Sequence, residues 1–280
     1  MIKKLLLPAA VTGLLFFGCA NKTQNIKPLS SKSIELLEKY GVNESALIKT
    51  KNGYLFVIPD AKGAAIYELD QNYNLKWKKT TPVLIDLVKY EVKDSKLYIL
   101  GYDQKAQKPV LLTYNLSGKL LNKKYFGKKF DLAKDFTTLN KHVYVATTHY
   151  SKDNNSDIVI YSDNKTITLS TPNMDNVFFI SQYNGNILVI GTTRGTDQDV
   201  LIALKTPDNK TLWANKIDLG MDETPESYKI LKNGEIKLKV LSTDNMGAER
   251  DMTFIIDKNG KIKKVKKGVE FKELPIKLRT

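Results

Sequence analysis

The sequence predicts an all-β fold built from about five copies of one four-stranded unit. Turn-forming pairs such as Asn184-Gly185 recur ahead of short apolar runs, and these runs return about every 45 residues. Helical periodicity is confined to one short stretch near the start of the chain. Short apolar runs between turns are typical of strands. A unit that repeats at this period buries its faces by stacking on its neighbours.

Composition limits the chemistry that the chain can carry. The 280 residues have a formal net charge of +14, two histidines and one cysteine. A lone cysteine excludes an internal disulfide framework and a thiolate metal cluster. The apolar fraction of 42% is sufficient for a sizeable core.

Residues 1–18 predict a secretory signal peptide. Lys3 and Lys4 precede an apolar run of 13 residues, Leu5 to Phe17, which is too short to cross a bilayer as a permanent helix. The run leads into Gly18-Cys19. This junction resembles the bacterial lipoprotein signal, in which the chain is cut before a cysteine whose sulfur carries a diacylglycerol. Leucine is the commoner residue where Phe16 stands, and a plain signal peptide with an incidental cysteine is the alternative.

The lipoprotein resemblance implies an address for the mature protein. Cys19 is expected to be lipidated, and its acyl chains, palmitate among them, are expected to anchor the chain to a membrane without spanning it. Asn21 follows closely and is not the aspartate that often retains lipoproteins at the inner membrane. We therefore expect a bacterial cell-envelope protein, at the outer membrane and facing the periplasm.

A tether and one helix are expected before the repeats. Residues 19–30 are polar and lack periodicity, which indicates a flexible tether. Residues 31–43 predict a short amphipathic helix, with Ile34, Leu37 and Tyr40 on one face and Gly41 at its end. The remaining residues, 44–280, are assigned to the repeat domain.

The second strand of each unit shows the repeat most clearly. These strands start at Tyr54, Lys96, His142, Asn186 and Glu235, which are 42, 46, 44 and 49 residues apart. Third strands are expected at Ala65–Leu69, Val110–Tyr114, Ile158–Tyr161, Val200–Leu204 and Thr253–Ile256. Four strands at this spacing are typical of a β-propeller blade. About five blades are predicted, with six blades, an open β-sandwich or an irregular barrel as alternatives.

The fourth copy carries a family resemblance. It reads as an aliphatic strand, Gly191-Thr192-Thr193, Asp199-Val200, and a strand with Trp213. This pattern resembles the quinoprotein-like and WD40-like propeller repeats of bacterial cell-envelope proteins. The resemblance implies blade packing and assigns no chemistry.

Two segments depart from the repeat. In the fifth copy, Lys237 and Lys239 alternate where the other copies have apolar residues, so one face of that unit is expected to be exposed. The tail from Val269 to Thr280 lies beyond the fifth copy, and we expect it to pair with the first blade. Pro275 restricts it to an edge position.

Few residues point to catalysis or metal binding. His142 and His149 are an odd number of positions apart, so a strand would direct them to opposite faces. Oxygen-rich loops at Asp153–Asp157 and Asp197–Asp199 suit calcium in ligand type but lack a complete ligand set. Trp77 and Trp213 occupy matching places and are expected to pack between blades. No recognisable catalytic motif is present, so no enzyme activity, cofactor or metal is predicted.

The basic residues cluster on two predicted outer strands. A contact surface is predicted at Lys119, Lys123, Lys124, Lys128, Lys129, Lys261, Lys263 and Lys264. Lysines on an outer edge also prevent sheets from aggregating, which is the structural interpretation. Nucleic acid is not an expected partner, because the signal sends the chain out of the cytoplasm.

These observations predict a membrane-anchored lipoprotein that acts as a non-enzymatic binding or scaffold platform for an envelope protein. One alternative is an envelope structural protein that binds anionic lipid or polysaccharide through its lysines. The other is an enzyme that uses the propeller channel.

Overall fold

The computed structural model describes residues 31–151, 155–163, 165–265, 272–275 and 278. The predicted signal peptide, the tether and Cys19 lie outside these residues. The chain divides into two compact units, Met1–Leu47 and Ile48–Thr280. The second unit begins at Ile48, and residues 44–47, which were assigned to the repeat domain, belong to the first unit.

The first unit contains helix α1 (Ser31–Tyr40) and the 3-10 helix η1 (Glu44–Ala46). Gly41 ends α1 in the left-handed conformation, with φ of +71°, and its N–H donates to the Leu37 carbonyl. The predicted helix face was wrong at Leu37, which is 48% exposed, whereas its neighbour Leu36 is 2% exposed. Leu36 lies four residues before the half-buried Tyr40, so Tyr40 keeps its predicted place on the less exposed face and Leu36 takes the place predicted for Leu37. No helix in the described part of the chain has the length and apolar character needed to cross a membrane.

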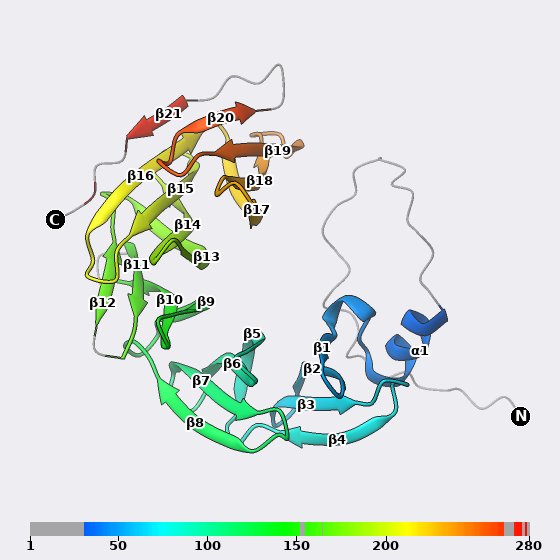
Figure 1. Ribbon diagram of the computed structural model, residues 1–280. Coiled ribbons are helices and arrows are strands. Elements are labelled where there is room, and N and C mark those ends of the chain that lie inside the picture. The colour runs from blue at the N-terminus through cyan, green and yellow to red at the C-terminus, as the bar shows by residue number, and fades with distance from the viewer. Residues whose placement is uncertain (1–30, 152–154, 164, 266–271, 276–277, 279–280) are drawn as a thin grey trace, which may run out of the picture. The chain divides into compact units, whose positions relative to one another are not determined.

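The second unit consists of five antiparallel sheets, which we number 1 to 5 in chain order (Figure 1). Sheet 1 contains β1 (Ile48–Thr50), β2 (Gly53–Asp60), β3 (Gly63–Leu69) and β4 (Leu75–Thr80). Sheet 2 contains β5 (Ile85–Lys93), β6 (Lys96–Asp103), β7 (Lys108–Asn115) and β8 (Leu120–Tyr125). Sheet 3 contains β9 (Leu132–Leu139), β10 (His142–Tyr150), β11 (Ser156–Tyr161) and β12 (Thr166–Leu169). Sheet 4 contains β13 (Met174–Tyr183), β14 (Asn186–Arg194), β15 (Gln198–Lys205) and β16 (Thr211–Asp218). Sheet 5 contains β17 (Asp222–Ile230), β18 (Ile236–Thr243), β19 (Glu249–Ile256) and β20 (Ile262–Val265).

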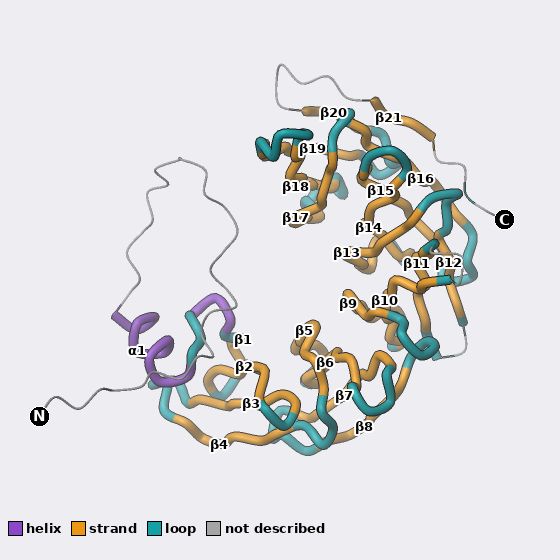
Figure 2. Tube along the Cα trace, turned by 180° about the vertical axis from the view of Figure 1, so that it is seen from behind, coloured by secondary structure: helices purple, strands orange, loops and turns teal. Residues whose placement is uncertain are grey.

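The predicted strand positions and the count of five units are confirmed. All five predicted third strands lie within β3, β7, β11, β15 and β19. Short loops join the strands, as Figure 2 shows in teal and orange. At the predicted Asn184-Gly185 turn both residues have positive φ, +49° and +76°, the conformation that a two-residue hairpin turn requires. This arrangement of sheets fits an all-β, propeller-like fold.

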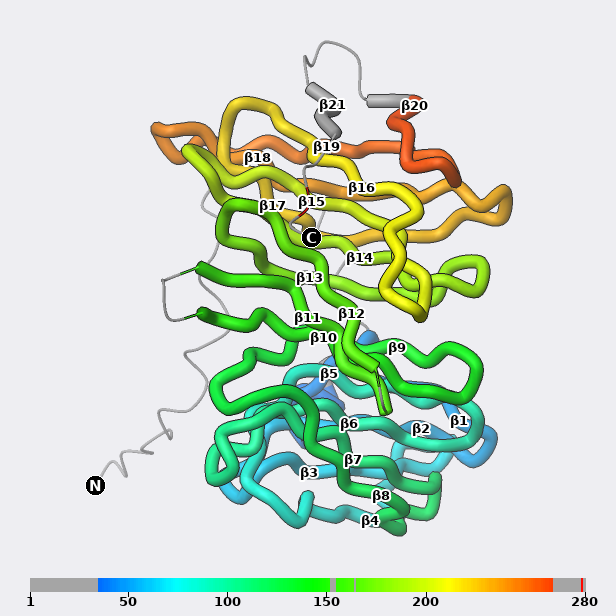
Figure 3. Tube along the Cα trace, turned by 90° about the vertical axis from the view of Figure 1, so that its left-hand side faces the viewer, coloured from blue at the N-terminus to red at the C-terminus, as the bar shows by residue number. Residues whose placement is uncertain are grey.

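The sheets follow one another in chain order (Figure 3). Apolar clusters join each sheet to the next in the chain. In sheets 2, 3 and 4, successive apolar residues of a strand point to opposite faces, so each of these sheets packs against a neighbour on both sides. In β14, Ile187 and Val189 pack toward sheet 3, and Leu188 and Ile190 pack toward sheet 5. The core is thus a series of apolar layers between sheets.

Sheet 5 departs from this alternation, as its sequence predicts. In β18, Ile236, Leu238 and Val240 join the cluster shared with sheet 4, whereas Lys237 and Lys239 are exposed. None of the four clusters of described residues includes members of both sheet 5 and sheet 1. The second face of sheet 5 therefore carries two exposed lysines, beside the half-buried Leu241 and Ile255.

The expected position of the tail was wrong. Strand β21 (Lys272–Pro275) pairs with β16 and extends sheet 4 to five strands, with Pro275 opposite Asn215. As predicted for a strand with a proline, β21 lies at an edge. The outer strands β4 and β8 carry three and two lysines, whereas β16 carries one and β12 carries none. Pairing with β21 covers the outer edge of β16.

Candidate functional site

The predicted lysines lie on two separate outer edges. Lys123 and Lys124 belong to β8 of sheet 2, and Lys263 and Lys264 belong to β20 of sheet 5, while Lys119 and Lys261 lie just before these strands. Sheets 3 and 4 come between the two edges in the series (Figure 1). Lys124 pairs with Asp163, and Lys263 Nζ lies 3.1 Å from Glu235 Oε1. The structure therefore does not unite the eight lysines into one surface.

Lys128 and Lys129 differ from the other predicted lysines in position, because they belong to the loop from β8 to β9. This loop lies at the end of the sheets where second strands turn into third strands and fourth strands cross to the next sheet. We call this the loop end, and we call the opposite end, which carries the other hairpins, the turn end. Both lysines are exposed there, directly before Phe130.

Phe130 is the most unusual residue of the loop end. Its backbone has φ of +69°, in the left-handed region that bulky side chains rarely occupy, and its side chain is 60% exposed. The Phe130 N–H donates to the Gln107 carbonyl at 3.0 Å, which ties it to the loop between β6 and β7. Both a strained backbone and an exposed aromatic ring are unfavourable in the free protein.

Buried carboxylates support the loops around Phe130. Asp103 accepts the N–H groups of Lys105 and Ala106 and the Tyr125 hydroxyl, at 2.6 to 2.9 Å. Burial alone would raise the pKa of Asp103, but these hydrogen bonds hold it below its usual value. Asp131 is fully buried and accepts from the Lys128 N–H, the Tyr161 hydroxyl and His149 Nδ1. The conformation of the Phe130 loop is therefore fixed from beneath.

Exposed apolar side chains gather at the loop end. Its members, in addition to Phe130, are Leu84, Leu132, Tyr150, Met174 and Met246, which is 93% exposed. The connections of the turn end, within the described residues, contain no exposed large apolar side chain; they are rich in Asn, Asp, Gly and Lys. Leu75, Leu121 and Leu212 are exposed near the turn-end starts of β4, β8 and β16, and Tyr125 is exposed where β8 reaches the loop end. The two ends thus differ in their connections, since exposed large apolar residues occur in the connections of the loop end alone among the described residues.

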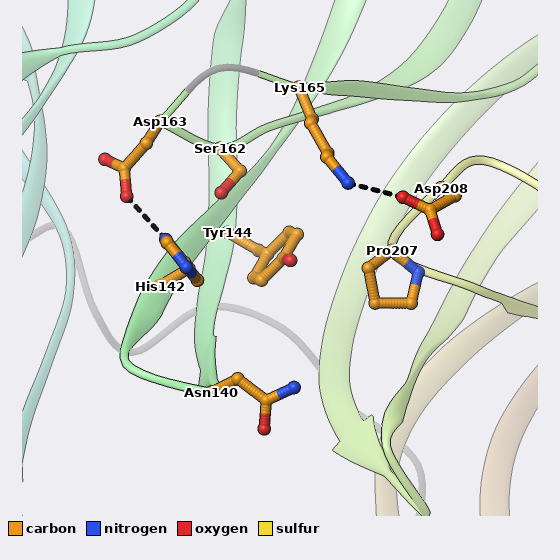
Figure 4. Close-up of a pocket in the computed structure, with 8 residues that line it drawn as sticks. All are labelled: Asn140, His142, Tyr144, Ser162, Asp163, Lys165, Pro207 and Asp208. Atoms are coloured by element: carbon orange, nitrogen blue, oxygen red, sulfur yellow. Dashed lines mark hydrogen bonds and ion pairs between the residues drawn. The ribbon is translucent and has the colours of Figure 1, made fainter.

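A cavity of about 320 Å³ lies at the turn end, between the hairpins of sheets 3 and 4 (Figure 4). It is lined by Asn140, His142, Tyr144, Ser162, Asp163, Lys165, Pro207 and Asp208. Its charged groups are already paired: Lys165 with Asp208, and His142 Nδ1 with Asp163 Oδ2 at 2.9 Å. Hydrogen bonds from Lys124 and His142 hold the pKa of Asp163 below its usual value. Such paired, solvated groups join two sheets and leave little free charge for a ligand.

The two histidines face opposite sides of sheet 3, as their spacing predicts. His142 lies on the side of Tyr144 and Ala146, which pack toward sheet 4, and its side chain is 58% exposed. His149 contacts the buried Asp131 at 2.6 Å on the side facing sheet 2. An Asp–His pair is the orienting half of a general base. Among the described residues, no hydroxyl donates to His149 Nε2.

Three buried carboxyl groups recur at one register position, and sequence reasoning missed them. Strands β9, β13 and β17 each contain a bulged residue, Lys134, Phe178 and Glu226, and Asp131, Asp175 and Glu223 lie three residues earlier. All three are fully buried. Asp175 accepts the Thr171 N–H and hydroxyl, yet burial raises its pKa to about 6. The shared position of the three carboxyl groups follows from the strand register. In the sequence, each of them resembles an ordinary polar residue near a turn.

The predicted oxygen-rich loops have different outcomes. Asp153 and Asn154 lie outside the described residues. Asp197 and Asp199 are joined by Asp218, and carboxylate oxygens of the three lie within 4.8 Å of one another. These are the described residues whose carboxylates are grouped closely enough to hold a metal ion.

The chain matches no protein-family model and no curated protein. Among solved structures, dihydro-heme d1 dehydrogenase NirN in complex with DHE superposes with a TM-score of 0.48 at 11% identity, over 80% of this chain and 44% of that one. A putative 6-phosphogluconolactonase from Bacteroides uniformis gives a TM-score of 0.46 at 12% identity, over 80% of this chain and 72% of that one. The chain thus spans less than half of NirN. At these identities, neither the dehydrogenase activity nor the lactonase activity can be assigned to this chain.

Proposed function

We propose that this chain is a non-enzymatic binding platform whose loop end receives an envelope protein. In this proposal the five sheets are the blades of a β-propeller, and lipidated Cys19 anchors the chain to the outer membrane, facing the periplasm. The second face of the fifth blade carries two exposed lysines, Lys237 and Lys239.

Phe130 carries the proposal. A phenylalanine that is 60% exposed at φ of +69° combines two unfavourable features at one residue. Backbone strain of this kind clusters at binding and switch sites, where a partner compensates for it. Burial of an aromatic anchor by a partner is also the commonest source of binding energy in a protein interface.

The surroundings of Phe130 define the chemistry of the partner. Leu132 and Tyr150 extend the apolar surface on the same sheet, and Lys128 and Lys129 place positive charge beside it. A complementary partner has an apolar pocket for the ring and carboxylates at the rim of that pocket.

Site-specific photocrosslinking tests the proposal in intact cells. A photoreactive phenylalanine analogue replaces Phe130 in the full chain, and a matched control replaces Asn184, which lies in a polar turn-end hairpin. We expect one recurrent envelope protein crosslinked from position 130 and absent from position 184. Identical products from both positions, or none from position 130, would contradict the proposed surface.

A second candidate function is the binding of anionic lipid or polysaccharide through the outer strands. Exposed lysines at Lys119, Lys123 and Lys261 favour it. Binding of this kind weakens as salt screens the charges. Cosedimentation with anionic vesicles at low and at physiological salt distinguishes the two candidates, since binding through Phe130 is less sensitive to salt.

A further inference from the structure

Three acidic side chains, Asp197, Asp199 and Asp218, come together at the loop end of sheet 4, and a fourth, Glu223 of sheet 5, lies within their electrostatic field. Asp197 lies in the connection from β14 to β15, Asp199 near the start of β15, and Asp218 at the end of β16. Pairing of Val200 with Ile217 places Asp199 beside Asp218 across the ladder. Glu223, near the start of β17, belongs to the next sheet.

Glu223 has little compensation for its burial. Its side chain is fully buried, neither carboxyl oxygen has a hydrogen bond of good geometry, and only the Leu219 N–H lies near enough to favour its ionised form. Burial raises the pKa of Glu223 to about 8; the nearby Leu219 N–H opposes this rise, whereas Asp199, Asp218 and Asp197 add to it. The carboxyl therefore lies in the field of the three aspartates. Asp199, at 2% exposed, also has one oxygen, Oδ1, without a partner.

Lys216 compensates for only part of this charge. Its Nζ lies 2.6 Å from Asp199 Oδ2 and 3.5 Å from Asp218 Oδ2. Arg194, the nearby arginine, pairs with Asp222 at 3.1 Å, outside the group of four. One ammonium thus serves the three grouped aspartates, through Asp199 Oδ2 and Asp218 Oδ2, and Asp199 Oδ1 stays without a partner. Buried polar atoms left in this state are costly unless something else binds them.

We propose that Asp197, Asp199, Asp218 and Glu223 form a calcium site that links sheets 4 and 5. The donor set consists of oxygen alone, without histidine or cysteine, which suits a hard cation. Calcium accepts carboxylates from several strand ends in flexible geometry, whereas magnesium demands a near-ideal octahedron and retains more water. The ion faces Asp199 Oδ1 and Glu223, while Lys216 keeps its contacts with Asp199 Oδ2 and Asp218. This site is independent of the partner proposed for Phe130.

Calorimetric titration of the metal-free protein with CaCl2 tests this site, with MgCl2 and NaCl of equal ionic strength as comparisons. We expect binding of one calcium ion per chain, together with a higher unfolding temperature in calcium, because the ion binds only the folded state. Glu223→Gln and Asp199→Asn should each weaken calcium binding at least about tenfold, since each removes one ligand charge. Asp197→Asn should also weaken calcium binding. Because Asp197 is less buried, this variant serves as the test if Glu223→Gln or Asp199→Asn does not fold.

Asp157→Asn is the matched control. Asp157 pairs with His149 in sheet 3 as Asp199 pairs with Thr193 in sheet 4, but it contacts Ser170 and belongs to no acidic group among the described residues. Calcium binding should be unchanged in this variant. Absence of binding by the wild-type protein would overturn the proposal. Equal binding by the wild-type, Glu223→Gln and Asp197→Asn proteins would also overturn it.

Discussion

The indole of Trp213 in sheet 4 lies directly against Gly260 of sheet 5. A Cβ built at Gly260 would come within 2.6 Å of Trp213 Cδ2 and Cε3, and Trp213 Nε1 donates to the Lys258 carbonyl at 3.1 Å. Trp77 in sheet 1 meets Gly118 of sheet 2 in the same way, with a Cβ 2.8 Å from its ring. Each tryptophan thus packs against the glycine in the turn between the third and fourth strands of the following sheet. This confirms the predicted packing of both indoles between neighbouring units.

Gly260→Ala should destabilise the protein by about 2–4 kcal/mol, through strain at φ of +87° and overlap with the indole. Gly185→Ala is the matched control, since Gly185 has a similar φ of +76° but no heavy atom lies within 4 Å of a Cβ placed on it. It should lose only about 1 kcal/mol, from backbone strain. Denaturant unfolding followed by tryptophan fluorescence measures both. Equal losses would show that the Trp213 contact does not matter.

Lys89→Met should destabilise the protein by about 2–3 kcal/mol, because it leaves the buried Asp135 without its counter-ion. Lys89 Nζ lies 2.5 Å from Asp135 Oδ1, and Asp135 Oδ2 accepts the Ile180 N–H at 2.8 Å, so this carboxylate connects sheets 2, 3 and 4. Burial raises the pKa of Asp135, and Lys89 opposes that rise.

Two further variants complete this test. Lys93→Met removes a single hydrogen bond to the Thr138 carbonyl and should cost about 1 kcal/mol or less. The double variant Lys89→Met, Asp135→Asn should recover part of the loss, since it removes the uncompensated charge. Additive losses in the double variant would refute the coupling between Lys89 and Asp135.

The stability of the protein should depend on Asp175 between about pH 4 and pH 6. Its pKa is about 6 in the folded state and 3.8 as the ordinary value, so the folded protein binds the proton first as pH falls. The contribution of Asp175 to stability is thus largest below about pH 4 and declines as pH rises through 6, by at most about 3 kcal/mol. Asp175→Asn should flatten this part of the curve of unfolding free energy against pH. The exposed Asp251→Asn should leave the slope unchanged, and an unchanged slope in Asp175→Asn would refute the assignment.

Cys19→Ser should release the protein from membranes, because it removes the sulfur to which acyl chains are attached in the lipoprotein hypothesis. Fractionation of cells that express the full chain measures this, and the mass of the mature N-terminus should lose the lipid. Lys4→Ser, in the signal segment, leaves the cysteine in place and should retain the membrane-bound form. A membrane-bound Cys19→Ser protein would rule out the lipid anchor.

Sequence periodicity was sufficient to predict the sheets. In β14 and β15 the apolar residues form continuous runs, because both faces of sheet 4 are buried, and each run is bounded by turn residues. The exposed face of β18 was visible as well, because Lys237 and Lys239 interrupt the apolar pattern at every second position. These signals are local, so a single sequence contains them.

Features that depend on pairing between distant segments were not predictable. The tail was expected to pair with the first blade, which corresponds to sheet 1. It pairs instead with β16, at the outer edge of sheet 4. Glu223 and Asp175 looked like ordinary polar residues near turns, and their equivalence follows from bulges that only strand register reveals. The conformation of Phe130 depends on a hydrogen bond to Gln107, which no local pattern encodes.

The second face of sheet 5, with its two exposed lysines, limits how the molecule could lengthen in evolution. Sheets with two apolar faces can be duplicated within the series, because each new copy finds an apolar neighbour on both sides. A copy added after sheet 5 would have to bury Lys237 and Lys239, at a large desolvation cost. Conversely, replacing both lysines with valine would create an adhesive surface through which separate molecules associate. Two lysines in β18 therefore set this face apart from the apolar faces of sheets 2, 3 and 4.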